Sequence, residues 1–145
     1  MTRFVVLLPV LAGLLVRAQT AGVRLDNEGD PGGLRISNSG PAIALTSKVT
    51  VERLRDGKWI VTPVRFELID RCTNTETPKC RELGAGDSFV PLRWNGYTCS
   101  GQCNRSCRSN HYAGPGEFRF VVAACDGKAR FIGPEFTIPA EKRRK

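Results

Sequence analysis

The chain contains 145 residues, with 22 basic and 14 acidic side chains, six cysteines and a formal net charge of +8. This length suits one domain with its own hydrophobic core. His111 is the only histidine, and no Gly-x-Ser-x-Gly elbow accompanies it, so no Ser-His or Cys-His catalytic pair is indicated. The basic residues are not interleaved with aromatic ones as on a nucleic-acid platform. We therefore expect no enzyme, no cofactor and no nucleic-acid partner.

The N-terminus has the pattern of a cleavable export signal. Arg3 precedes an apolar run over residues 4–16, and the small residue Ala18 follows at a suitable cleavage position. The run is shorter than the roughly 20 residues of a membrane helix, so we expect no membrane span. We predict a signal peptide over residues 1–18 and a secreted or periplasmic mature chain. Cleavage after Ala21 and a buried N-terminal helix are the alternatives.

The mature chain divides into a lead-in, a β domain and a tail. Residues 19–33 are polar and rich in glycine and aspartate, which predicts a flexible lead-in. The β domain is expected over residues 34–139. Basic residues dominate residues 140–145, which predicts a solvated basic tail.

Short β-prone runs alternate with turn signals in the β domain. Period-2 alternation and β-branched residues predict strands over 34–36, 43–54, 59–61, 64–69, 88–92, 117–125, 129–132 and 135–138. Asp-Gly pairs at 56–57 and 126–127 predict tight turns, because these residues tolerate positive φ angles. The stretch 95–116 predicts a loop held by its cysteines. About seven strands without an amphipathic helix predict a single all-β sandwich of immunoglobulin or fibronectin type.

Turn and strand-entry motifs follow one another in a characteristic order. They are Asn-Ser-Gly-Pro at 38–41, Asp-Gly-Lys-Trp at 56–59, Leu-Gly-Ala-Gly-Asp-Ser at 83–88 and Gly-Pro-Gly-Glu-Phe-Arg-Phe at 114–120. This order resembles that of bacterial immunoglobulin-like domains, with Ala85 in place of the usual proline and Phe118 in place of the usual tyrosine. The resemblance spans about residues 34–138 and implies the sandwich fold. It implies no catalytic residue, since such domains serve adhesion, surface assembly, binding and inhibition.

Six cysteines in an exported chain predict three disulfides. Cys72 and Cys80 bracket a polar loop and form a natural local pair. Cys125 ends the strongest predicted strand, so one cysteine of the 99–107 segment is expected to reach it. Among the pairings that six cysteines allow, we predict Cys72–Cys80, Cys99–Cys107 and Cys103–Cys125.

A metal site is an alternative use of the same cysteines. Cys99, Cys103, Cys107 and His111 recur every four residues, and on a helix this spacing would align a ligand set for zinc or copper. The glycine, serine and asparagine residues between them disfavour that helix. We therefore predict disulfides and no metal, with a metal-binding protein as the alternative.

Aromatic residues beside the cysteine loop form the preferred binding patch. Trp94 and Tyr97 precede the loop and Tyr112 follows it, and exposed aromatic side chains contact sugars and protein partners. A buried core anchor is the alternative for Trp94. The sequence thus predicts an exported, non-enzymatic interaction module that presents the loop to a protein or glycan partner. A secreted proteinase inhibitor is a further alternative.

Overall fold

The computed structural model describes residues 22–29, 32–68, 79–90, 93–99 and 110–140. Within these ranges the chain is all-β, with eleven strands and no helix. A search of the same ranges finds no helix with the length and apolar content needed to cross a membrane. The predicted signal peptide over residues 1–18 lies outside the described residues.

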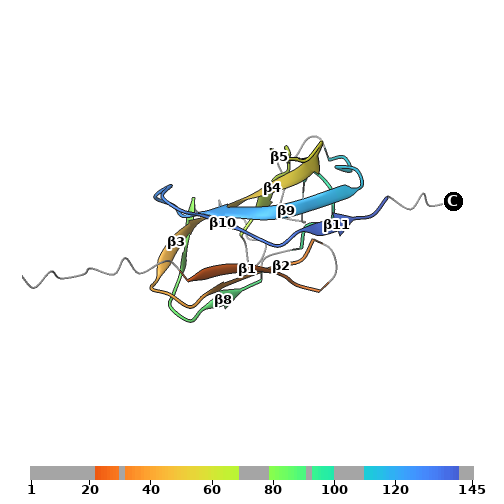
Figure 1. The fold of residues 1–145 in the computed structure, drawn as a ribbon. Coiled ribbons are helices and arrows are strands. Elements are labelled where there is room, and N and C mark those ends of the chain that lie inside the picture. The colour runs from red at the N-terminus through yellow and green to blue at the C-terminus, as the bar shows by residue number, and fades with distance from the viewer. Residues whose placement is uncertain (1–21, 30–31, 69–78, 91–92, 100–109, 141–145) are drawn as a thin grey trace, which may run out of the picture.

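The strands form three antiparallel sheets. The strands are β1 (Val23–Asn27), β2 (Leu34–Asn38), β3 (Ile43–Thr46), β4 (Lys48–Arg55), β5 (Lys58–Val61), β6 (Phe66–Glu67), β7 (Cys80–Leu83), β8 (Ser88–Phe89), β9 (Gly116–Ala123), β10 (Arg130–Ile132) and β11 (Phe136–Ile138). One sheet has the order β1-β2-β8, and a larger one has the order β10-β9-β4-β5, with β11 paired to β9 and β6 to β4. The third sheet pairs β3 with β7. Figure 1 shows the β1-β2-β8 sheet beneath the larger one, and both sheets are curled.

The hydrophobic core fills the space between the two layers. On the larger sheet, Val51 of β4 pairs with Phe120 of β9, and both side chains are fully buried. On the facing sheet, Leu34 and Ile36 of β2 are equally buried. Apolar and polar residues alternate in β2, in most of β4 and in the first half of β9, and successive side chains of a strand point to opposite faces. The alternation in the sequence therefore places one face of each strand in the core.

The expectation of a flexible lead-in is wrong for much of residues 22–33. Residues 23–27 form β1, in which Leu25 is buried opposite Ile36 of β2. Gly32 is also buried and accepts a 2.9 Å hydrogen bond from the backbone N–H of Trp94. A Cβ at Gly32 would lie 2.1 Å from the Trp94 carbonyl oxygen, so this contact requires glycine. The polar composition concealed the strand because its stability comes from pairing with β2.

Most of the predicted strands form, with shifted bounds. The predicted strand over 43–54 is divided at Ser47, where the chain changes partners: the Ser47 N–H donates to the carbonyl of Lys79, next to β7, and the Ser47 carbonyl accepts from the N–H of Leu68, next to β6. The predicted strand over 64–69 contains the two-residue β6, and β7 was not predicted. The tight turn between β4 and β5 is confirmed, with φ angles of 50° at Asp56 and 73° at Gly57.

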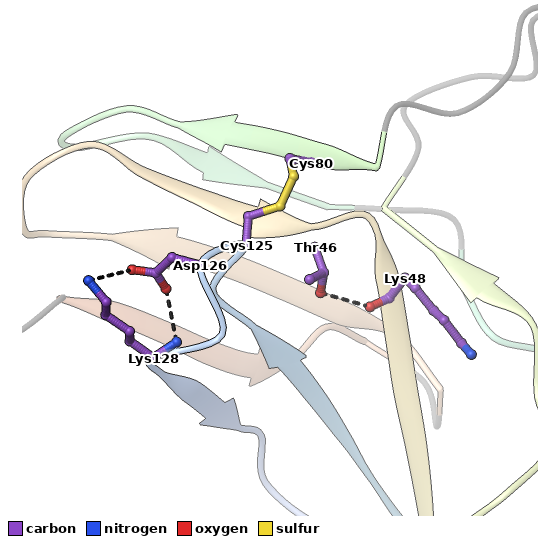
Figure 2. Close-up of a disulfide and its surroundings, with 6 residues drawn as sticks. All are labelled: Thr46, Lys48, Cys80, Cys125, Asp126 and Lys128. Carbon is purple, nitrogen blue, oxygen red and sulfur yellow. Dashed lines mark hydrogen bonds and ion pairs between the residues drawn. A yellow bond between two sulfur atoms is a disulfide. The ribbon is translucent and has the colours of Figure 1, made fainter.

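The predicted disulfides Cys72–Cys80 and Cys103–Cys125 are wrong, because Cys80 and Cys125 bond to each other. Figure 2 shows the bond between Cys80, at the start of β7, and Cys125, in the turn after β9. Both residues lie against β3: Cys80 pairs with Thr46, and the N–H of Cys125 donates to the carbonyl of Ala44. Contacts with β3 therefore bring together two cysteines that are 45 residues apart, and the short loop that suggested Cys72–Cys80 does not determine the pairing. The observed bond also leaves Cys125 unavailable to Cys103.

Candidate interaction site

The two ends of the cysteine loop form a short antiparallel stem. Residues 96–98 pair with residues 111–113 through hydrogen bonds from Ala113 to Gly96 at 2.8 Å and from Thr98 to His111 at 2.9 Å. Tyr97 and Tyr112 form a β-bridge between these two bonds. The chain therefore enters and leaves residues 99–110 through one hydrogen-bonded base, which we call the stem.

Side chains close the upper end of the stem. The hydroxyl of Thr98 accepts a 3.1 Å hydrogen bond from the N–H of His111. The side-chain oxygen of Asn110 accepts another, also 3.1 Å long, from the N–H of Cys99. Short polar side chains commonly satisfy backbone groups in this way where a ladder ends. Pairing thus continues to the last described residues on either side of the loop.

The stem is attached to the larger sheet. The N–H of Arg65 donates to the carbonyl of Thr98 at 2.8 Å, and Arg65 forms a parallel bridge with Cys99. Thr98 and Cys99 are both buried. Arg65 directly precedes β6, which pairs with β4. The stem is therefore continuous with the backbone hydrogen bonding of the sheet.

Trp94 belongs to the core, so it cannot serve as an exposed binding residue. Its side chain is fully buried and makes edge contacts with Phe118 and Phe136, with ring centroids 5.0 and 6.0 Å apart. The indole N–H donates a 2.7 Å hydrogen bond to the carbonyl of Tyr97. The structure therefore selects the core-anchor alternative for Trp94, and this anchor holds the base of the stem.

Tyr97 and Tyr112 lie together, as the binding-patch prediction required. Their ring centroids are 5.6 Å apart, and both side chains are half-buried. The hydroxyl of Tyr112 donates to the carbonyl of Pro139, which ties the stem to the chain after β11. Gly96, at a φ of 85°, leaves room for the Tyr112 ring 3.1 Å from where a Cβ would stand. The pair braces the stem and exposes only part of each ring.

A basic hollow of about 160 Å³ opens beside the stem. It is lined by Arg53, Arg55, Thr62, Pro63, Val64, Thr98, His111, Tyr112 and Ala113. Arg55 and His111 are exposed at its surface. The charged lining residues are arginines, so the hollow favours an anionic group over a cationic one.

Arg53 lines the hollow and also binds the segment between the stem and β9. Its guanidinium donates to the carbonyls of Ala113, at 3.0 Å, and Pro115, and it lies over the Phe118 ring at 5.5 Å. Sequence reasoning missed Arg53 and Arg55 as site residues. Arg53 and Ala113 stand 60 residues apart, and only the β4–β9 pairing brings them together.

The metal alternative loses one of its ligands. Cys99 is disulfide-bonded, and metals in thiolate sites require the deprotonated free sulfur. Among the described residues, no group of three histidine, cysteine or acidic side chains could hold a metal ion. Three further cysteines, Cys72, Cys103 and Cys107, lie outside the described residues. The predicted Cys99–Cys107 pair therefore stays a prediction.

Comparison with protein-family models, curated proteins and solved structures finds no match to this chain. The properties of the site therefore rest on its own geometry. That geometry consists of a loop base tied to a sheet, a tyrosine pair that braces it and a basic hollow beside it.

Proposed function

We propose that the chain is an exported, non-enzymatic interaction module that presents the loop between Cys99 and Asn110 to a protein or glycan partner. The observation that carries the proposal is the stem, whose ends are hydrogen-bonded to each other and to the larger sheet. A loop with a fixed base loses less conformational entropy when it binds. Binding residues are commonly found on loops held by a rigid scaffold.

The strand order supports an immunoglobulin-like architecture for this module. In chain order, β1 and β2 share a sheet with the late strand β8, whereas β4, β5, β9 and β10 lie in the larger sheet together with β6 and β11. Immunoglobulin-type sandwiches likewise place their first two strands with the fifth and their third with the last two. The loop between β8 and β9 then connects the two sheets and includes the stem.

Export is the second part of the proposal. The residues 1–18 carry the signal pattern, and disulfides at Cys80, Cys99 and Cys125 suit an oxidising compartment. In such a compartment the disulfide at Cys99, where the loop begins, stays closed while the loop meets partners outside the cytoplasm.

Binding assays with a loop-replaced variant test the proposal. The processed chain would be probed on a glycan array and on an array of extracellular proteins, alongside a variant with residues 100–109 replaced by a Gly-Ser linker, which keeps the stem. Lys128→Ala, in the exposed turn after β9, is the matched control. We expect a ligand that binds the native chain and the control but not the loop variant. Equal binding by the loop variant, or no ligand on either array, would contradict the proposal.

A proteinase inhibitor is a second candidate, favoured by the same stem. A loop whose two ends are fixed holds its cleaved halves together, so a protease that binds it releases no product. Serial assays against serine, cysteine and metalloproteases test this candidate. Inhibition that disappears in the loop-replaced variant would support it, and a flat result across the panel would remove it.

A further inference from the structure

Strand β5 forms one edge of the larger sheet. The sheet order ends at β5, and within the described part of the chain no strand pairs with its outer side. Ile60 and Val61 are 49% and 63% exposed, although both are large and apolar. The β4–β5 register is continuous, and β5 contains no proline. Proteins usually protect an edge strand with a bulge, a proline or charged residues, because open edges pair with other strands. Lys58 is the only charged residue of β5.

The β4–β5 register shows which backbone groups of β5 face outward. The N–H of Thr62 donates to the carbonyl of Val51 at 2.9 Å. In an antiparallel ladder, residues bonded to the neighbouring strand alternate with residues that are not. Ile60 and Lys58 therefore bond to β4, whereas Trp59 and Val61 direct their N–H and C=O groups away from it. The edge offers two donors and two acceptors.

Side chains on the outer face of the sheet hold this edge in place. Trp59 pairs across from Leu54 and lies under the guanidinium of Arg119, 4.2 Å from the ring centroid. Arg119 in turn forms a 2.8 Å ion pair with Glu52, which also pairs with Arg130 at 3.1 Å. The side chain of Glu52 is only 7% exposed. The network fixes the Trp59 ring beside the exposed Val61.

We propose that β5 pairs antiparallel with β5 of a second copy of this chain, about a two-fold axis at Ile60. Trp59 of each copy then lies opposite Val61 of the other, and each such pair exchanges two backbone hydrogen bonds. All the outward groups of both strands are satisfied. The two Ile60 side chains face each other at the axis, and Lys58 lies opposite Thr62 of the second copy.

The choice of a second copy follows from the self-complementary sequence of the edge. A tryptophan opposite a valine is a favourable cross-strand pair, and no like charges lie opposite each other. An axis at Val61 would instead place Pro63, which has no N–H, opposite Trp59. An axis at Trp59 would place Gly57, a turn residue at a φ of 73°, opposite Val61. Only the axis at Ile60 uses both outward residues of each copy.

Charge variants of Ile60 test the pairing by sedimentation. The processed chain would be analysed from about 1 μM to about 1 mM, a range that brackets weak association. We expect the average mass to rise toward that of a dimer. Ile60→Lys and Ile60→Asp each place like charges at the axis, so each variant alone should stay monomeric. An equimolar mixture should recover the dimer, because opposite charges then face each other.

Two further variants separate edge pairing from other effects. Val61→Pro removes an N–H that does not bond to β4, so the variant should remain folded and lose the dimer. Ile132 lies in β10, at the other end of the sheet order from β5, and is 54% exposed, similar to Ile60. Ile132→Lys should therefore leave the dimer unchanged. A native chain that stays monomeric throughout the range would overturn the proposal. So would a mixture of the two Ile60 variants that stays monomeric.

Discussion

Arg35 of β2 and Glu28, directly after β1, form an ion pair at the surface. The guanidinium of Arg35 donates two hydrogen bonds to the Glu28 carboxylate, at 2.7 and 2.9 Å. These hydrogen bonds have the largest effect and lower the pKa of Glu28; desolvation of the carboxyl opposes them, and the charge of Arg35 adds a further lowering smaller than either. The same bonds raise the pKa of Arg35. Exposed pairs of this kind contribute little to stability, so the pair is best detected through titration.

Removal of Arg35 should raise the pKa of Glu28. In Arg35→Gln the carboxylate loses its charged donor, and its pKa should return toward the ordinary value of a glutamate. A carboxyl whose pKa is depressed by folding contributes stability above its unfolded pKa and loses it as pH falls through its folded pKa. The native chain should therefore lose slightly more stability than the variant on acidification. NMR titration of Glu28 measures the shift, and an unchanged pKa would contradict this account.

Arg53 should matter more for stability than its neighbour Arg55. Arg53→Met removes two charge-assisted hydrogen bonds to the chain that precedes β9 and leaves two carbonyls without their donor. Each such bond contributes about 1.5–3 kcal/mol at most, so we expect a loss of about 1–3 kcal/mol in unfolding free energy. Arg55→Met, at an exposed position, is the control. Denaturant titration would contradict the role of Arg53 if both variants unfolded alike.

The Cys80–Cys125 disulfide joins the start of β7 to the turn after β9, and both cysteines contact β3. It closes a loop of 45 residues, for which the chain-entropy relation gives about 4 kcal/mol of stabilisation. The double variant Cys80→Ala/Cys125→Ala should therefore unfold at a lower denaturant concentration, with a loss of about 2–4 kcal/mol. Peptide mapping of the native chain checks the pairing directly. A Cys72–Cys80 peptide in that map would contradict it.

Strands with their own alternation were predictable, and strands that depend on a partner were not. The pattern at 117–125 indicated β9, and Asp56-Gly57 indicated the β4–β5 turn. Strands β1 and β7 have weak patterns and form through pairing with β2 and β3. The disulfide was mispredicted for the same reason. The prediction paired Cys80 with the cysteine nearest in sequence, because it did not include β7 and its pairing with β3.

Predicted turns also acquire roles that only the structure reveals. Residues 38–41 and 83–87 were each read as separate turns. Asn38 is buried, and its side-chain amide donates to the carbonyls of Pro41, Leu83 and Gly84. One side chain thus joins the two turns. A polar residue at the end of a strand gives no sequence signal for such long-range bonding.

At the scale of the molecule, the candidate site could be predicted only in outline. The position of the cysteine loop and the closeness of Tyr97 and Tyr112 followed from the sequence. The core position of Trp94 did not, because an aromatic residue beside a loop has the same local pattern whether buried or exposed. The basic hollow did not either, since Arg53 and Arg55 reach it only through the sheet.

The loop stem and the β5 edge are separate features of the larger sheet. The stem meets the chain at Arg65, after β5 has ended at Val61. Pairing of two copies through β5 would therefore display two loops from one continuous sheet. Two linked sites bind a partner with repeated epitopes more tightly than one site does.

Amide hydrogen exchange tests the central claim, a loop base as ordered as the core, most directly. The N–H groups of Arg65, Thr98 and Ala113 donate the bonds that close and attach the stem. We predict that these amides exchange as slowly as those of β4 and β9, because they open only with the sheet. Exchange as fast as that of the exposed turn at Asp56 and Gly57 would contradict a fixed base and, with it, the proposed presentation of the loop.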